Sequence, residues 1–272
     1  MNAVINQPAV QFDERRVLVN GAAVAARVSG QGTPIVLFHS LLADDSSFDP
    51  IATVLAQRHH VVIMALPGFG GSARVDGDLE QIADHMAAAI TALGLGQAPI
   101  LLGNGYGGFI ALLTAMRHPG SASRLVLADC GAAFSEAGRA AFRGMSAKAR
   151  ENGLAGISDI AMRRLFSPAY QGAHPELIEA RRARFLAVDI DTFHAACAAL
   201  ASLDVRAGLA QVTVPALVLC GEFDEATPPE MSRELAAGLP NATLQILPGC
   251  AHVPQLQEPA QFLAAIEAFI AD

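Results

Sequence analysis

Short apolar segments alternate with longer amphipathic segments through the first half of the chain. The near-continuous apolar runs, typical of strands covered on both faces, lie at residues 34–39, 60–66, 100–103 and 124–129. The segments with helical periodicity that fall between them lie at residues 48–57, 79–93 and 106–118. A strand and a helix that repeat in this order predict a parallel sheet with right-handed crossovers.

The alternation is preceded by a hairpin and interrupted once. The hairpin is predicted at residues 16–29, with its turn at Asn20-Gly21, a strong turn dipeptide. After Cys130, residues 131–209 are rich in alanine and arginine and helical in period, without a convincing strand. The later elements are predicted as strands at 215–221 and 243–247 and helices after Pro229 and at 259–270.

These segments define the expected domain organisation. We predict an α/β fold whose mostly parallel sheet has about eight strands, with helices on both faces. Residues 1–130 and 210–272 would form the core domain, and residues 131–209 a helical lid, or cap, inserted between strands.

Composition and charge narrow the functional classes. The chain has 272 residues, 52% of them hydrophobic, a net charge of −8 and a pI near 5.4. The acidic excess argues against a nucleic-acid or anionic-membrane surface, and no apolar run approaches the roughly 18 residues of a membrane span. Residues 1–16 show no basic start followed by an apolar segment, so we expect no secretory signal. We therefore predict a cytoplasmic protein with a small-molecule substrate, and a homodimer is left open.

No cofactor is expected from the sequence. The four cysteines, which we interpret as reduced thiols, form no C-x-x-C pair and no metal-ligand spacing with histidine. The segment GFGG at residues 68–71 follows a strand but opens no dinucleotide-binding unit. We predict neither a metal nor an organic cofactor.

Residues 99–115 carry the most informative motif. They read PILLGNGYGGFIALLTA, an apolar strand that runs through Gly103-Asn104-Gly105-Tyr106-Gly107 into a helix. This is the context of a G-x-S-x-G nucleophile elbow, and Gly105 stands where the serine is expected. The central residue of such an elbow is strained by about 1–3 kcal/mol unless it is glycine. Glycine therefore suits the fold while removing the attacking hydroxyl.

Two further residues follow in the order expected of a catalytic triad. Asp224 lies in GEFDEATPP just after a strand, and His252 lies in LPGCAHVPQ just after the last strand. A nucleophile position, an acid and a histidine in this order, each at the end of a strand, are typical of α/β-hydrolases.

On these motifs the chain resembles the α/β-hydrolase family, and within it the group typified by 3-oxoadipate enol-lactonases. The resemblance spans nearly the whole chain, including HS-L after the third strand, LPGFGGS after the fourth and SLDVRAGL at the end of the lid segment. It implies an enzyme that hydrolyses a small carboxylic ester or lactone, with His252 as general base and Asp224 as the residue that orients it. It also implies an oxyanion hole formed by the backbone N–H groups of Leu41 and Tyr106.

Three residues depart from the pattern of that family. Gly105 replaces the nucleophile, Ser40 replaces the usual glycine before the oxyanion loop, and Ala65 replaces the acidic residue common before Leu-Pro-Gly. The first departure puts acyl-enzyme chemistry in question.

Several other residues are candidates for the site. We expect His39, Ser40, Tyr106 and Cys250 to contact substrate, although a histidine at a strand end more often bonds to backbone and a cysteine near the base more often is a buried thiol. Ser40 is disfavoured as an alternative nucleophile, because it lies on the oxyanion side rather than within obvious reach of His252. Asp129 is an alternative triad acid.

Lid arginines offer a further contact. They are Arg163, Arg164, Arg181, Arg182 and Arg184. An arginine fork suits the carboxylate of an enol-lactone substrate. Most of the five are expected on a solvated helix face, with one facing the pocket.

Three accounts of Gly105 are compatible with the sequence. The chain is a serine hydrolase inactivated at this position, or an enzyme that uses the His252/Asp224 dyad without a covalent intermediate, or a non-catalytic ligand-binding protein. The second account includes hydrolysis by direct water attack, lyase chemistry and cofactor-free reaction with oxygen. Because Asp224 and His252 are both intact, the binding protein is the least favoured.

Overall fold

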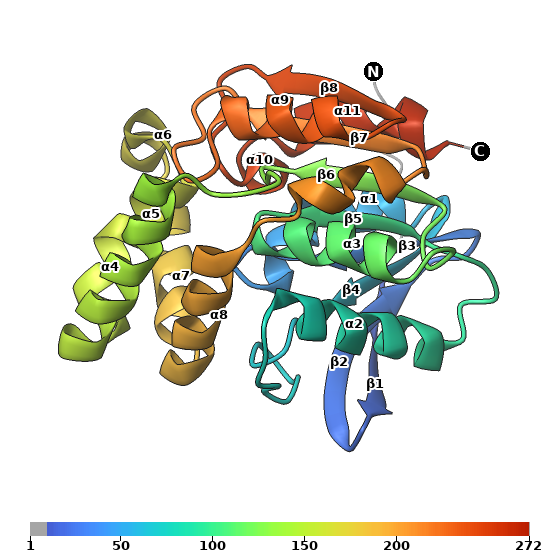
Figure 1. Ribbon diagram of the computed structural model, residues 1–272, viewed down its shortest axis with the longest axis horizontal. Helices are drawn as coiled ribbons and strands as arrows, with labels where there is room; N and C mark the ends of the chain where they lie inside the picture. The colour runs from blue at the N-terminus through green and yellow to red at the C-terminus, as the bar shows by residue number, and fades with distance from the viewer. Residues whose placement is uncertain (1–9, 272) are drawn as a thin grey trace, which may run out of the picture.

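The computed structural model describes residues 10–271 (Figure 1). Residues 1–9, the start of the segment considered for a secretory signal, lie outside the described residues.

A single eight-stranded sheet forms the centre of the described chain. Its strand order is β1-β2-β4-β3-β5-β6-β7-β8, and only the β1–β2 and β2–β4 pairs are antiparallel. The predicted mostly parallel sheet is confirmed. The strands are β1 (Asp13–Val19), β2 (Ala22–Ser29), β3 (Thr33–Phe38), β4 (His59–Met64), β5 (Ile100–Asn104), β6 (Arg124–Ala128), β7 (Ala216–Gly221) and β8 (Ala242–Leu247).

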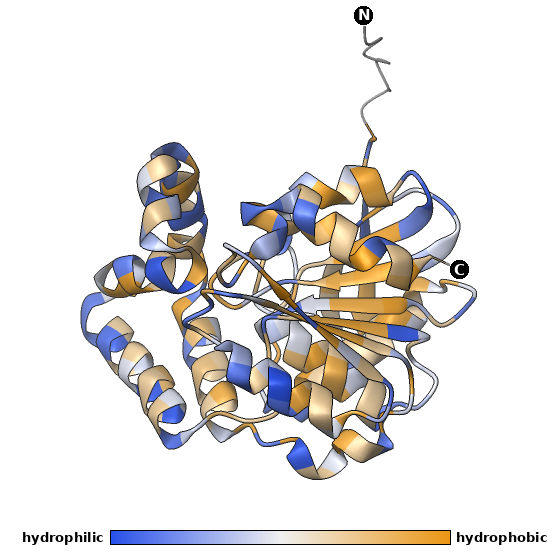
Figure 2. Ribbon diagram, turned by 90° about the horizontal axis from the view of Figure 1, so that it is seen from above, coloured by the Kyte–Doolittle hydropathy of each residue, from blue (hydrophilic) through white to orange (hydrophobic). Residues whose placement is uncertain are grey.

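Helices cover both faces of this sheet, as predicted. Alternate residues of β3 show the two layers: Val36 and Phe38 belong to the core beneath α2 and α3, and Ile35 and Leu37 to the core beneath α1 and α11. Figure 2 shows the hydrophobic strands lying between helical layers. The helices of this core region are η1 (Asp45–Phe48), α1 (Asp49–Leu55), α2 (Leu79–Leu93), α3 (Tyr106–Arg117), α9 (Pro229–Gly238), α10 (Pro254–Gln257) and α11 (Pro259–Ile270).

The segment between β6 and β7 is helical. In Figure 1 its main helices lie together to the left of the sheet. The sequence predicts this helical insertion, but its status as a separate subdomain stays a prediction. Its elements are α4 (Glu136–Asn152), η2 (Leu154–Ile157), α5 (Ser158–Leu165), α6 (Pro168–Ala173), α7 (Pro175–Leu186), α8 (Ile190–Ser202) and η3 (Arg206–Gln211).

Within residues 10–271 no single helix is both long and apolar enough to cross a membrane. Only α7 and α8 taken together meet the criterion of length and composition, and these two helices are bent by 94° at their junction.

The start of α3 packs directly against the end of β3. A Cβ added to Gly107 would lie 2.1 Å from the carbonyl oxygen of Phe38, which is backbone and has no room to move. The Gly107 N–H donates to the carbonyl oxygen of His39 at 3.0 Å. Glycine at position 107 therefore allows the start of α3 to pack directly against the backbone at the end of β3.

We expect Gly107→Ala to lower the free energy of unfolding by about 3 kcal/mol or more, because the methyl group would push α3 away from β3. Gly144→Ala, in the middle of α4 with open space around it, is the matched control and should raise stability by about 0.5–1 kcal/mol. Urea denaturation of both variants tests this expectation. Equal effects of the two changes would contradict it.

Candidate active site

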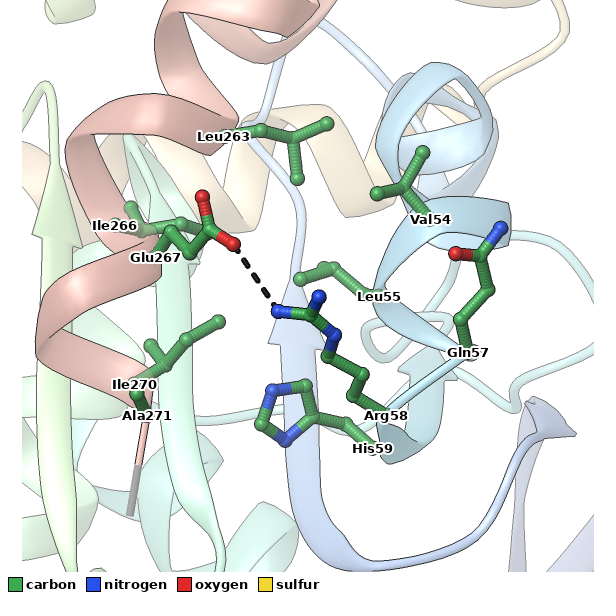
Figure 3. A pocket seen from close by; sticks show the side chains of 10 residues that line it. All are labelled: Val54, Leu55, Gln57, Arg58, His59, Leu263, Ile266, Glu267, Ile270 and Ala271. Carbon is green, nitrogen blue, oxygen red and sulfur yellow. Dashed lines mark hydrogen bonds and ion pairs between the residues drawn. The ribbon is translucent and has the colours of Figure 1, made fainter.

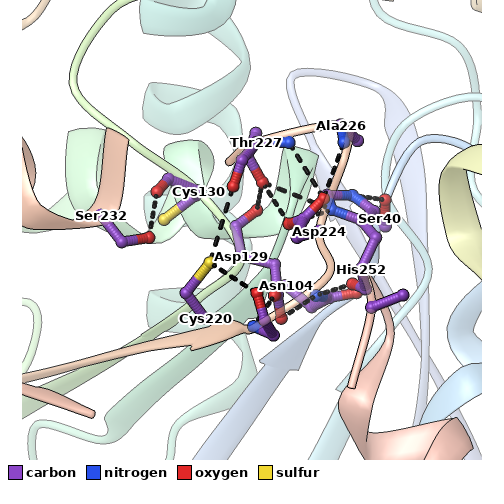
Figure 4. A network of polar contacts seen from close by, with 12 residues as sticks. Ser40, Asn104, Asp129, Cys130, Cys220, Asp224, Ala226, Thr227, Ser232 and His252 are labelled. Carbon is purple, nitrogen blue, oxygen red and sulfur yellow. Dashed lines mark hydrogen bonds and ion pairs between the residues drawn. The ribbon is translucent and has the colours of Figure 1, made fainter. Parts of the chain in front are cut away.

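Polar side chains from far apart in the sequence meet at the carboxyl ends of the parallel strands (Figure 4). Asn104 ends β5, Asp129 follows β6, Asp224 follows β7 and His252 follows β8. Open parallel sheets place their ligand sites at this edge. All four side chains are buried.

Gly105 forms the turn between β5 and α3. Its backbone angles are φ +55° and ψ −118°, in the region that L side chains rarely adopt. The turn is fixed by the Gly105 N–H, which donates to the carbonyl oxygen of Ala128 at 2.9 Å. A Cβ added at Gly105 would lie 2.6 Å from Ser40 Oγ and 2.7 Å from His252 Nε2. The strand–turn–helix expected from the sequence is therefore present, with glycine at its tip and two polar side chains around it.

His252 and Asp224 form a buried hydrogen-bonded pair. Asp224 Oδ2 accepts from His252 Nδ1 at 2.9 Å. The other carboxylate oxygen accepts from the backbone N–H groups of Ala226 at 2.7 Å and Thr227 at 3.0 Å, and the Thr227 hydroxyl lies 2.7 Å from Oδ2. This turn fixes the carboxylate, which in turn holds the imidazole in the tautomer whose Nε2 carries the lone pair. Asp129, the alternative acid, makes no such contact with the imidazole.

Ser40 lies closer to the base than the sequence indicates. Its Oγ is 3.1 Å from His252 Nε2, so the expectation that Ser40 lies out of reach of His252 is wrong. The chain after β3 turns back over the tip of the Gly105 turn, and the absence of a side chain there leaves room for the hydroxyl. Loop direction of this kind has no signal in the residue pattern.

Asn104 and Thr227 were missed by sequence reasoning. The Asn104 side-chain amide donates to the carbonyl oxygen of His252 at 2.9 Å and to Asp129 Oδ2 at 3.3 Å. The Thr227 hydroxyl also lies 2.7 Å from the carbonyl oxygen of Asp129. The position of Asn104 at a strand end, beside Gly105, was the available signal. Both residues position the acid and the base, and Thr227 also borders the pocket.

Asp129 is a second buried carboxyl group beside Asp224. Burial raises its pKa well above that of an ordinary aspartate, and the neighbouring carboxylate of Asp224 raises it further. The N–H of Gly221, at 2.8 Å from Oδ1, and the amide of Asn104 act in the opposite direction. We conclude that Asp129 holds its proton at pH values where most aspartates have lost it.

Two of the expected substrate contacts are wrong. His39 is fully buried, and its Nε2 accepts from the N–H of Leu66 at 3.1 Å while its Nδ1 donates to the carbonyl oxygen of Ser40 at 3.0 Å. Cys250 is also fully buried, in the core under α11, and its Sγ lies 3.3 Å from Gln261 Oε1. His39 thus joins backbone segments, as the alternative interpretation expected, and Cys250 points away from the base although it is two residues from it.

A small apolar pocket lies over Gly105 and under the helical insertion. It encloses about 30 Å³, roughly the volume of one water molecule, so a larger substrate requires its walls to move. Ser40, Leu41 and Tyr106 border it, as expected. The remaining lining residues are Leu42, Gly105, Phe109, Phe134, Phe142, Met145, Arg164, Leu200, Ala226, Thr227 and His252.

One lid arginine borders this pocket, as the sequence predicts. Arg164 is half-buried over the ring of Phe142, with 5.8 Å between its guanidinium carbon and the ring centroid. Burial lowers its pKa, whereas the nearby carboxylates of Asp224 and Glu225 raise it, and within residues 10–271 neither is close enough to form an ion pair with it. Arg181, expected on a solvated face, instead is buried and contacts Asp44 at 3.4 Å.

The metal-binding potential of the site is weak. Ligand-type atoms of Asp129, Cys220 and Asp224 lie within 4.8 Å of one another. Both oxygens of Asp224 already accept from Thr227 or His252, and Asp129 accepts from Gly221. The hydrogen-bond network therefore accounts for this cluster without a cation.

A second hollow of about 340 Å³ lies between α1 and α11 (Figure 3). The ion pair between Arg58 and Glu267, at 3.1 Å, crosses it. The described residues that line it include no serine, cysteine or aspartate. It therefore lacks the arrangement found beside Gly105.

Comparison with known proteins identifies the family of this chain. The model of the Alpha/beta hydrolase family matches residues 35–266, and the chain belongs to this family. It is 25% identical to 3-oxoadipate enol-lactonase 2 of Acinetobacter baylyi, covering 86% of this chain and 88% of the lactonase. A solved structure of a thermophilic esterase from Thermogutta terrifontis superposes with a TM-score of 0.85 at 26% identity, covering 96% and 98% of the two chains.

One relative is much longer. The chain is 28% identical over 258 residues to polyketide synthase ThaQ of Burkholderia thailandensis. The match covers 93% of this chain and only 12% of the synthase.

We expect Asp129→Asn to gain stability relative to the native protein as pH rises above about 4. Above the ordinary aspartate pKa the unfolded chain releases the Asp129 proton while the folded protein keeps it, so the native protein loses stability until its raised pKa is passed. Asparagine removes this titration and tolerates the positive φ of 52° found here. The measurement is the melting temperature of both proteins across the pH range.

Asp204→Asn is the control, for which we expect the opposite dependence of stability on pH. Arg206 lowers the pKa of Asp204 to about 2, so this carboxylate contributes stability above the ordinary aspartate pKa and loses it as pH falls. Its replacement should therefore become more unfavourable as pH rises from about 2 to about 5. A difference for Asp129→Asn that is independent of pH would show that Asp129 is ionised in the folded protein.

Proposed function

We propose that this protein hydrolyses a small carboxylic ester or lactone, with His252 as the base and Asp224 as the residue that holds it. The observation that carries the proposal is the imidazole bound by Asp224 at Nδ1, whose Nε2 lies at the apolar pocket. Such a base can accept a proton from a hydroxyl group or water that attacks a carbonyl carbon. The relationship to an enol-lactonase and an esterase supports an ester or lactone as the bond that is cleaved.

Gly105 is compatible with such an enzyme. A serine at this turn would place its Cβ 2.6 Å from the present position of Ser40 Oγ and 2.7 Å from that of His252 Nε2. The contact between Ser40 Oγ and His252 Nε2 supports an enzyme whose imidazole acts on another hydroxyl or on water, over a serine hydrolase inactivated at this position. The fully assembled acid–base pair of Asp224 and His252 argues against a pure binding protein.

Backbone donors are available for the oxyanion. Leu41 and Tyr106, whose backbone N–H groups are the proposed donors, border the pocket, and Tyr106 begins α3, where the helix dipole favours negative charge. In this proposal they stabilise the oxygen of the tetrahedral intermediate, by about 3–4 kcal/mol for each donor.

Arg164 suggests the kind of substrate. A partly desolvated guanidinium that forms no direct ion pair in the described chain gains from an anionic ligand. Apolar side chains line most of the pocket around it. We therefore propose a substrate with a small apolar acyl part beside Gly105 and a carboxylate toward Arg164.

His252→Ala should lower kcat for p-nitrophenyl butyrate or a small lactone by about 10²–10⁴-fold, because the proton acceptor is lost. Hydrolysis of a panel of p-nitrophenyl esters and lactones, followed by colour or by pH-stat, provides the measurement. His60→Ala, at the opposite end of β4 from the site, is the control and should retain native rates. Unchanged turnover in His252→Ala would rule out the proposed role.

Arg164→Gln should discriminate between two esters that differ by one charge. We expect kcat/KM for mono-p-nitrophenyl succinate to fall by about 10–100-fold, the equivalent of one charge-assisted hydrogen bond, while p-nitrophenyl butyrate is hydrolysed as before. Arg163→Gln, one residue away and exposed, serves as the control. Equal losses for both esters would show that Arg164 acts through packing rather than through charge.

A further inference from the structure

The side chain of Ser40 completes a chain of three groups. Its Oγ lies 3.1 Å from His252 Nε2, and His252 Nδ1 lies 2.9 Å from Asp224 Oδ2. In the neutral imidazole the proton on Nδ1 is donated to Asp224, so Nε2 accepts from the Ser40 hydroxyl. A hydroxyl, an imidazole and a carboxylate joined in this order form the arrangement that activates a nucleophilic serine.

The hydroxyl occupies space that the turn leaves free. A Cβ at Gly105 would come within 2.6 Å of Ser40 Oγ and 3.1 Å of Ser40 Cβ. A side chain at residue 105 and the present position of Ser40 therefore exclude one another. The turn that lacks a side chain and the serine that reaches over it form one feature.

Backbone contacts on two sides hold Ser40 in place. Its carbonyl oxygen accepts from the Ala43 N–H at 3.2 Å and from His39 Nδ1 at 3.0 Å. His39 is itself fixed, because its Nε2 accepts from Leu66 and its carbonyl oxygen accepts from Gly107. The side chain is almost fully buried yet borders the pocket. A group held in this way is preorganised for reaction.

We propose that Ser40 is the nucleophile of this protein, an inference that rests on the proposed hydrolase function. Ser40 Oγ forms a bond to the acyl carbon of the ester or lactone while its proton moves to His252 Nε2. The tetrahedral intermediate then breaks its bond to the alkoxy oxygen, which takes the proton from His252, and leaves an acyl ester on Ser40. His252 then takes a proton from water, whose oxygen bonds to the acyl carbon. The bond between that carbon and Ser40 Oγ breaks, His252 gives the proton to Ser40 Oγ, and the carboxylic acid leaves.

The oxyanion donors fit this position of the nucleophile. Leu41 directly follows Ser40, as a donor residue follows the serine of a nucleophile elbow. Tyr106, the other proposed donor, borders the same pocket. Ser40 and both donor residues therefore border one pocket.

Covalent labelling provides the direct test. The native protein is treated with a fluorophosphonate, digested with trypsin and sequenced by mass spectrometry. We expect one adduct, in the peptide of residues 28–58 and on Ser40 rather than Ser46 or Ser47, and we expect its loss in His252→Ala. An adduct on another residue, or no adduct at all, overturns the proposal.

Kinetics of variants provide the second test. Ser40→Ala should lower kcat for p-nitrophenyl butyrate by about 10³-fold or more, whereas Ser47→Ala, buried in the same peptide but outside the pocket, should retain it. Ser40→Cys keeps the side-chain size and should be alkylated rapidly by iodoacetamide, with His252→Ala slowing that reaction. Melting curves confirm that each variant is folded.

The outcomes separate the two proposals. If His252→Ala abolishes turnover and Ser40→Ala does not, the hydrolase function stands and water attacks directly, so the role of Ser40 is overturned. If neither change affects turnover, both proposals fail.

Discussion

The hydrogen bond from the Asn104 side chain to the carbonyl oxygen of His252 joins the two halves of the candidate site. Asn104 ends β5 and precedes the Gly105 turn, while His252 lies 148 residues later in the chain. The amide oxygen of Asn104 accepts from Gln255 at 3.0 Å, so a second contact ties the same loop to β5. Because these groups are buried, the loss of one partner would leave the other unsatisfied. The position of the imidazole over the turn depends on this contact.

Two adjacent buried carboxyl groups can coexist because their surroundings differ. Asp224 has hydrogen-bond donors on both oxygens, including the imidazole. Asp129, which lies between β6 and β7, has fewer donors and the raised pKa that burial and its neighbour impose. Carboxyl oxygens of the two residues lie within 4.8 Å of each other, and like charges this close favour a proton on one of the two groups. The raised pKa of Asp129 therefore reduces the repulsion between two carboxyl groups that lie beside the imidazole.

The sequence was sufficient for the fold and for part of the site. Apolar runs and turn residues define the order of strands, and the ends of parallel strands must meet, so Asp224 and His252 could be placed together. Side-chain direction within a loop has no such rule. Cys250, two residues from His252, faces the core under α11 instead of the pocket, and Ser40 turns toward the base although its loop lies across the sheet. Asn104 contacts the loop of His252, which is 148 residues away in the sequence, and only the tertiary structure brings the two together.

The position of the hydroxyl group also changes the energetics of the turn. A serine at residue 105 would have to adopt φ near +55°, at a cost of about 1–3 kcal/mol, whereas Ser40 is not among the residues with positive φ. The protein thus presents a hydroxyl to His252 without strain at the turn. Ser40 is instead held by His39, whose ring contacts the backbone of Ser40 and of Leu66 and whose carbonyl oxygen accepts from Gly107. The accuracy with which Ser40 is placed therefore depends on a buried histidine that does not border the pocket.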